Sequence, residues 1–351
     1  MRLFSNPSLK SLAPLLLKNK GTKGVRFTND LDGLSPPGQA ATMPKAVAYR
    51  FILYETQGNI ARLVLNRPAL NTWDYPGQGG IADEFYSALA QAAEDDQVKA
   101  VIIKGAGRVF SAGHDFATGD IYRQAPETGA RRVAQRTRLR INRRWVEAHQ
   151  SLLYFPKVTI AAVHGYCMGE GLAVALACDI LLVAEDCQIG PAEQRLGAGG
   201  AGIGYIPILM LSVGLKRARE MLLQGRLLSG REAERAGLAA RCVPAEKLDE
   251  EAENLARAVC LLPRDGLAIG KAMTHLVYDR LGLSRGFILG YLGTALFTNA
   301  VYEEDEYNFY RERRHQGVKA AITRRESRYQ GLEGLGKESQ DDRPKVQADN
   351  P

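Results

Sequence analysis

Three short segments of this 351-residue chain carry residue types that could do chemistry together. Ser111, Ala112 and Gly113 form a small-residue turn directly before His114, and Gly-Glu-Gly at 169–171 opens a second run of small residues. A third segment places a lone carboxylate, Glu193, after Gly-Pro-Ala. Two such turns can aim backbone N–H groups at one oxygen, as an oxyanion hole does, and a carboxylate in an apolar pocket can transfer protons.

His114 is one of only five histidines, and its residue type leaves three roles open. It could be a metal ligand, a general base, or a backbone position that happens to carry an imidazole. None of the five cysteines forms a C-x-x-C pair, and no cysteine–histidine spacing is typical of zinc. We therefore predict no metal site, and we expect the cysteines to be buried, reduced thiols.

Other common motifs are absent or stand in the wrong context. The chain has no P-loop, HExxH or GxSxG pattern. GAGGAG at 197–202 matches G-x-G-x-x-G, and Glu220 follows at a suitable distance. However, the residues before it do not read as a buried strand, and Glu220 lies inside a helical pattern. We interpret this glycine run as a turn before a helix and not as a dinucleotide site.

Alternating strand and helix patterns must position these turns. The periodicity predicts two strands around a turn at 57–59 and a helix over 79–96 with Ile81, Phe85, Leu89 and Ala92 on one face. Buried strands are expected at 99–105, 157–165 and 179–185, and helices at 124–153, at 169–178 and over most of the chain after Tyr205. This order predicts a layered α/β core.

Composition narrows the class of protein. The chain is 45% hydrophobic, which is typical of a globular protein, and no apolar run reaches the roughly 18 to 20 residues of a membrane span. A net charge of +7 suggests an anionic partner, either a phosphorylated small molecule or nucleic acid. Part of this charge lies at 131–144, which we interpret as an arginine-rich, solvated helix.

Five segments, in order, resemble the crotonase superfamily, the enoyl-CoA hydratase/isomerase family. They are LVLNRPALNT (63–72), DDQVKAVIIKGAGRVFSAGHDF (95–116), KVTIAAVHGYCMGEGLAVALACDILLVAED (157–186), IGPAEQRLG (189–197) and LSGREAERAGLAARCVP (228–244). The resemblance implies an α/β spiral of repeated ββα units followed by C-terminal helices. It also implies an acyl-CoA thioester as substrate, no separate cofactor because coenzyme A is part of that substrate, and a homotrimer or dimer of trimers.

The resemblance assigns roles to the three segments. The N–H groups of His114 and Glu170 would form the oxyanion hole, although the family usually has glycine at the second position. Glu193 matches the second of two glutamates found in hydratases, whereas the position of the first holds Ala173. We therefore expect Glu193 to move the proton, and the missing first glutamate favours isomerisation. The Glu170 carboxylate should turn away from the oxyanion, although a second acid–base role for it stays open.

The substrate would be bound by residues around these positions. The resemblance suggests Arg67, Asn71, Ser111, Ala112, Gly113, Gly169, Gly171 and Ala173. Two alternatives remain: a β-diketone or cyclic β-keto-thioester hydrolase of the same fold, and a non-catalytic CoA-fold protein that binds RNA or a partner through 131–144. That segment has no interleaved aromatic residues and no RNA module is visible, so nucleic acid is not expected as the partner.

We divide the chain into four regions. Residues 1–48 are a basic extension and linker, 49–260 the crotonase spiral core, 261–320 a C-terminal helical trimerisation region, and 321–351 a polar, disordered tail. Residues 1–29 carry basic residues and no acid. This pattern is typical of a mitochondrial transit peptide and also of an unstructured extension. We expect a cytoplasmic protein without membrane attachment, with the mitochondrial matrix as the alternative.

Overall fold

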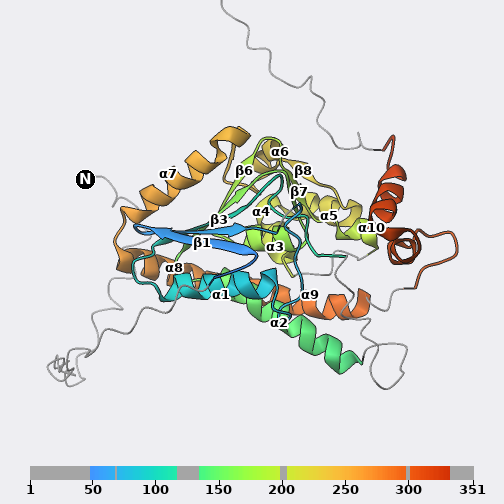
Figure 1. The fold of residues 1–351 in the computed structure, drawn as a ribbon, viewed down its shortest axis with the longest axis horizontal. Helices are drawn as coiled ribbons and strands as arrows, with labels where there is room; N and C mark the ends of the chain where they lie inside the picture. The colour runs from blue at the N-terminus through green and yellow to red at the C-terminus, as the bar shows by residue number, and fades with distance from the viewer. Residues whose placement is uncertain (1–47, 68, 117–133, 198–203, 298–300, 333–351) are drawn as a thin grey trace, which may run out of the picture. The chain divides into compact units, whose positions relative to one another are not determined.

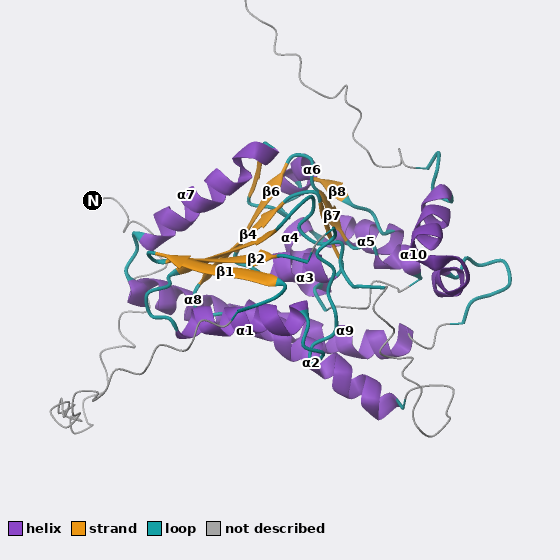
Figure 2. Ribbon diagram, viewed as in Figure 1, coloured by secondary structure: helices purple, strands orange, loops and turns teal. Residues whose placement is uncertain are grey.

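The computed structural model describes residues 48–67, 69–116, 134–197, 204–297 and 301–332. Predictions for most of the N-terminal extension, for the start of the helical segment at 124–153, and for most of the GAGGAG turn lie outside these residues. In the described part, the alternating pattern gives a mixed α/β fold with a largely parallel sheet (Figures 1 and 2).

Among the described residues, six strands form the main sheet in the order β1-β2-β3-β4-β6-β9. These are β1 (Ile52–Gln57), β2 (Ile60–Leu65), β3 (Ala100–Gly105), β4 (Val158–Val163), β6 (Ile180–Ala184) and β9 (Arg241–Val243). β1 and β2 pair antiparallel around the predicted turn, and the other neighbours are parallel. A smaller sheet joins β5 (Tyr166–Met168), β7 (Gln188–Gly190) and β8 (Leu228–Ser229).

Helices cover both faces of the main sheet (Figure 1). They are α1 (Ile81–Glu94), α2 (Gln135–Leu153), α3 (Glu170–Ala177), α4 (Ile206–Val213), α5 (Leu215–Gln224), α6 (Gly230–Arg235), α7 (Leu248–Cys260), α8 (Arg264–Leu281), α9 (Leu283–Phe297) and α10 (Phe309–Ser327), with short 3₁₀ turns η4 (Glu193–Leu196) and η5 (Ala245–Lys247). Glu220 lies within α5, as predicted, and its carboxylate pairs with Arg226.

Side-chain alternation along the strands divides the core between the two faces. Leu63, Val101 and Ile103 pack with α1, whose predicted apolar face is buried, in the larger cluster. On the other face, Ile102 and Ile160 pack in a smaller cluster with one side of α7. Successive side chains of a strand point to opposite faces, so one strand serves both clusters.

The short strands β5 and β7 matter for the site because each ends directly before a candidate segment. β5 ends at Met168, next to the Gly-Glu-Gly turn, and β7 ends at Gly190, before Glu193. The two strands are parallel neighbours with Met168 opposite Gly190. Parallel pairing brings both segments to the same edge of the small sheet.

The C-terminal helices expose much apolar surface. Ile269, Met273, Leu276 and Val277 recur at helical spacing along α8, and each is more than half exposed. Helix α10 consists of two helical segments joined by a kink at Gly317, and the second ends at Ser327, past the predicted start of the polar tail at 321. Residues 333–351 lie outside the described part. No helix in the described ranges combines the length and hydropathy that a membrane span requires.

Candidate active site

The two small-residue turns are in direct contact, and glycine permits that contact. Gly113 has φ +89° and Gly169 φ +53°, both in the left-handed region that glycine tolerates. A Cβ added to Gly169 would lie 3.3 Å from the Gly113 Cα, 3.6 Å from Oε1 of Glu193 and 3.8 Å from the backbone N of His114. All three predicted segments therefore meet at one point.

Backbone bonds fix the position of His114. The N–H of Trp73 donates to the Gly113 carbonyl at 2.9 Å, and the N–H of Asp115 donates to the Trp73 carbonyl at 2.8 Å. These two bonds hold the peptide of His114 beside the second turn. The imidazole is edge-on to the Tyr75 ring, with centroids 4.4 Å apart, so the side chain packs against an aromatic neighbour.

Glu170 is the first residue of α3, with Gly169 as the N-cap. Ala173 N–H donates to the Gly169 carbonyl at 3.0 Å and begins the helical bond pattern. N–H groups in a first helical turn have no acceptor inside the helix, and they lie at the positive end of its dipole. The Glu170 N–H is therefore available to an oxygen placed beyond the helix end.

The Glu170 side chain turns to a basic residue. Its Oε1 lies 2.6 Å from Nε2 of His149 on α2, and both side chains are almost fully buried. The contact is close, although its angles are not those of an aligned hydrogen bond. We expected this carboxylate to turn away from the oxyanion, and in the structure it lies against a histidine. His149 was missed in the sequence because it follows the segment 131–144, which we interpreted as solvated, and belongs to no motif.

Glu193 begins η4, and its carboxylate accepts from the hydroxyl of Tyr205. The hydroxyl lies 3.1 Å from Oε1 and 3.0 Å from Oε2. Burial raises the pKa of Glu193 to about 7, and the Glu170 charge adds to the rise, while hydrogen bonds from its own backbone and from Tyr205 oppose it. The carboxyl group of Glu193 is desolvated, whereas the residue as a whole keeps some exposed surface. With a pKa of about 7, the carboxyl group can exchange a proton near neutral pH.

Tyr205 is a second residue that sequence reasoning missed. It is buried directly before α4, and the chain between it and Glu193 includes the glycine-rich turn. Burial raises its pKa well above the ordinary value, and the Glu193 charge adds to this effect. The hydroxyl is therefore neutral and donates to the carboxylate. A tyrosine twelve positions after a glutamate carries no motif that would reveal this contact.

Arg67 and Asn71 are occupied by internal contacts. Arg67 pairs with Asp115 and donates from Nη1 to the Thr72 carbonyl at 2.7 Å. Asn71 donates from Nδ2 to the carbonyls of Ala106 and Val109, both at 2.9 Å, and is buried. These bonds shape the loop between β2 and α1. Binding of the nucleotide end of coenzyme A by the two residues stays a prediction.

The other predicted binding residues line or support the paired turns. Ser111 is buried, accepts from Trp73 Nε1 and Gly113 N–H, and donates to the Asn71 carbonyl. Ala112 N–H donates to Leu70 at 2.9 Å. A Cβ on Gly171 would approach the Ser111 Cβ to 2.6 Å, which shows how closely the turns pack. Ala173, one turn into α3, has no exposed surface and no carboxylate.

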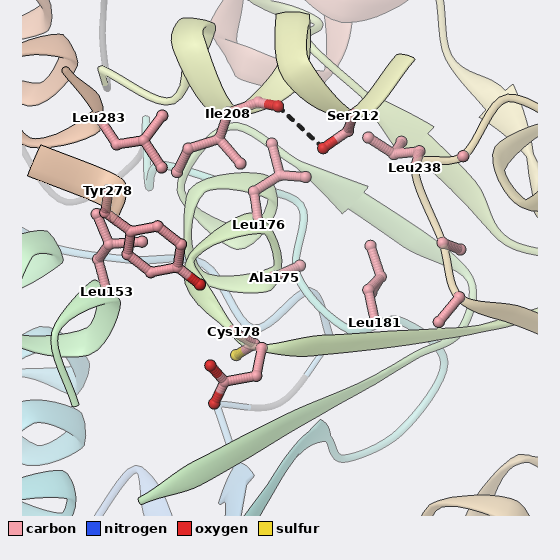
Figure 3. A pocket seen from close by; sticks show the side chains of 14 residues that line it. Leu153, Ala175, Leu176, Cys178, Leu181, Ile208, Ser212, Leu238, Tyr278 and Leu283 are labelled. Atoms are coloured by element: carbon pink, nitrogen blue, oxygen red, sulfur yellow. Dashed lines mark hydrogen bonds between the residues drawn. The ribbon is translucent and has the colours of Figure 1, made fainter. Parts of the chain in front are cut away.

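A cavity of about 310 Å³ lies elsewhere, at the opposite end of α3 (Figure 3). Leu176, Cys178, Leu181, Leu238 and Leu283 are among its lining residues, and none of the predicted site residues is. We place the candidate site at the paired turns because backbone donors and the perturbed carboxyl group meet there. In the part of the chain that the structure covers, no cluster of three or more histidine, cysteine or acidic side chains could hold a metal ion.

Comparisons with known proteins show which family the chain resembles. A family model described as enoyl-CoA hydratase/isomerase matches residues 55–284. A putative enoyl-CoA hydratase of Thermus thermophilus is 34% identical over 239 residues, which cover 68% of this chain and 89% of that protein. The crystal structure of an enoyl-CoA hydratase/isomerase from Xanthobacter autotrophicus Py2 matches with a TM-score of 0.68 at 30% identity, and the match covers 80% of this chain and 99% of that protein's chain. The crystal structure of a probable enoyl-CoA hydratase from Mycobacterium smegmatis matches with a TM-score of 0.62 at 29% identity, and the match covers 71% of this chain and 95% of that protein's chain.

Proposed function

Because the chain belongs to the enoyl-CoA hydratase/isomerase family, we propose that it moves a proton on an acyl-CoA thioester through an enolate. The N–H groups of His114 and Glu170 would donate to the thioester oxygen. Stabilising the negative charge on that oxygen makes the neighbouring carbon more acidic. Glu193 would remove the proton from one carbon and return it to another, and coenzyme A enters as part of the substrate.

One observation carries this proposal: a carboxyl group with a pKa near 7 lies against the turn that presents the backbone donors. A general base works best when its pKa is close to the working pH. Burial supplies this shift at Glu193, and the Tyr205 hydroxyl orients both oxygens of the carboxylate. The same carboxyl group can therefore accept and release a proton without a partner base.

The residue at 173 favours isomerisation over hydration. A hydratase of this family would hold water between two glutamates, and Ala173 supplies no carboxylate at the first position. Glu170, the other nearby carboxylate, is in contact with His149. A shuttle with one base can move a double bond without activating water. Hydrolysis of a β-diketone or cyclic β-keto-thioester is the alternative that the same carboxylate could serve.

The burial of polar side chains on α2 favours acyl-CoA binding over RNA binding by the basic segment. Within the predicted basic segment, Arg138 and Asn142 are buried, so the helix does not present all of its polar side chains to solvent. The charge of +7 is compatible with an anionic coenzyme A substrate. An anionic acyl-CoA ligand therefore accounts for the net positive charge of the chain, and no nucleic-acid-binding surface is needed to explain it.

We also propose self-association through the C-terminal helices. The exposed apolar residues of α8 form a continuous face, which a single chain would leave in water. A homotrimer or a dimer of trimers, as the family resemblance implies, would cover such a face. The oligomer would then be held mainly by burial of apolar area.

The experiment that tests the function compares wild type with Glu193→Gln on a panel of enoyl-CoAs, with products identified by mass spectrometry. We expect unchanged product mass with a moved double bond, and a fall in kcat on the order of 10²-fold or more in the variant. Glu147→Gln, an exposed glutamate on α2, is the matched control. Near-wild-type kcat in Glu193→Gln would reject the assignment. A gain of one water would indicate a hydratase, and cleavage a hydrolase.

A further inference from the structure

His149 has no part in the proposed proton transfer, yet it touches the residue that bears one oxyanion donor. It is 1% exposed, and its Nε2 lies 2.6 Å from Oε1 of Glu170. The ring stacks between Trp145, at 5.4 Å and 28°, and Phe287, at 5.5 Å and 15°. Residues of three helices, α2, α3 and α9, thus fix the imidazole in place.

The contacts define how the imidazole is protonated. Its Nδ1 lies 2.7 Å from the carbonyl oxygen of Trp145, which can only accept, so Nδ1 carries a proton. Burial alone would lower the pKa of His149, but the charge and close contact of Glu170, together with the hydrogen bond to the Trp145 carbonyl, outweigh it and leave the pKa raised. A raised pKa favours the protonated ring, which places its Nε2 against Oε1 of Glu170.

A carboxylate on Glu170 needs such a counter-charge for a specific reason. The N–H of this same residue would donate to the oxygen that becomes negative during the reaction. An uncompensated charge so close would repel that oxygen, in a buried site where screening is weak. It would also act on Glu193, whose pKa the Glu170 charge already raises.

Among the residues that the structure describes, the other titratable groups that interact with Glu170 do not provide this compensation. Tyr86 of α1 and Tyr205 before α4 both have pKa values raised well above ordinary by burial, and the Glu170 charge adds to each, so both are neutral. Glu193 is itself acidic. From α9, the Phe287 ring is apolar. In the described part of the chain, the basic side chain in contact with Glu170 is that of His149.

We propose that His149 is a positioning residue of the reaction, which neutralises the Glu170 carboxylate and holds it away from the oxyanion hole. The contact with His149 allows glutamate to stand at position 170, in the turn that forms part of the proposed oxyanion hole. This inference rests on the proposed function, since it assumes that the Glu170 N–H faces the thioester oxygen. It gives His149 no direct contact with substrate.

The test is a pH profile of kcat and kcat/KM for wild type, His149→Phe, Glu170→Gln and the double variant. Phenylalanine keeps the stack with Trp145 and Phe287 but removes the charge. Without the histidine, the Glu170 carboxylate lies uncompensated next to the oxyanion position, which should lower kcat. We expect His149→Phe to lower kcat on the order of 10-fold more when Glu170 is present than when it is glutamine. KM should change far less.

His149→Gln provides a second test, because glutamine keeps a donor but carries no charge. It should show the same dependence on Glu170, and it keeps the proposal testable if the phenylalanine variant does not fold. His275→Phe, on α8 and in contact with the rings of Tyr154 and Tyr278, is the matched control and should leave the profile unchanged.

Equal losses from His149→Phe with and without Glu170, or wild-type kcat in folded His149 variants, would overturn the proposal and leave only a packing role. Glu193→Gln belongs in the same assay. If it retains activity, the proposed function fails. If it is inactive while the His149 variants behave like wild type, the function stands and only the positioning role fails.

Discussion

Replacing Tyr205 by phenylalanine removes one hydroxyl group from the candidate site and should move the pH profile in a defined direction. The hydroxyl donates to both oxygens of Glu193, and this bond lowers the pKa of the carboxyl group against the effect of burial. Without it, burial and the Glu170 charge act unopposed by this donor. The pKa of Glu193 should therefore rise above its value of about 7.

The size of the shift follows from the bond that is lost. A hydrogen bond to a charged group contributes about 1.5–3 kcal/mol, and each pKa unit corresponds to about 1.4 kcal/mol, so the pKa should rise by roughly one to two units. At pH 7 the ionised fraction would fall from about one half to between roughly a tenth and a hundredth. Since the base acts as the carboxylate, kcat/KM at pH 7 should fall roughly 5- to 50-fold and recover at higher pH.

The assay is kcat/KM for the enoyl-CoA substrate between pH 5 and 10, in wild type and Tyr205→Phe. Tyr154→Phe is a suitable control, because its hydroxyl also donates to a carboxylate, that of Asp279, outside the site. A profile that stays in place, or that moves to lower pH, would refute the assignment of Glu193 as the base. A loss that does not recover at high pH would show that Tyr205 acts through packing instead.

Three further predictions follow from the same geometry. Because the folded-state pKa of Glu193 is raised from 4.5 to about 7, its proton stabilises the fold below pH 4.5 and this contribution is lost as pH rises to 7. Glu193→Gln should therefore be more stable than wild type at pH 8, by up to about 3 kcal/mol, with little gain at pH 4, in denaturant titrations. Asn71→Ala should lower the free energy of unfolding by at least about 2 kcal/mol, because it orphans two carbonyls and places alanine at φ +47°; a loss of acyl-CoA affinity without loss of stability would assign Asn71 to ligand binding instead. Met273→Glu on α8 should reduce the oligomer to smaller species in light scattering, with exposed Lys216→Glu on α5 as control, and an unchanged mass would place the interface elsewhere.

Local patterns predicted most of the secondary structure near the site. The alternation at 52–65, the apolar face of α1 and the buried strands β3, β4 and β6 follow from side-chain periodicity. The short strands β5, β7, β8 and β9 did not stand out, because two or three residues are too few to show a period. Two of them, β5 and β7, nevertheless bring Gly169 and Glu193 together.

The sequence by itself determined the family, the two small-residue turns and the lone Glu193, because these depend on residue type and order along the chain. Only the tertiary structure decided which groups surround that carboxylate. Tyr205 comes from beyond a glycine-rich turn and His149 from a helix whose sequence reads as solvated. Burial raises the pKa of Glu193, and contact with Glu170 raises that of His149 against the effect of burial. No local pattern encodes the distance between segments that meet only in the folded chain.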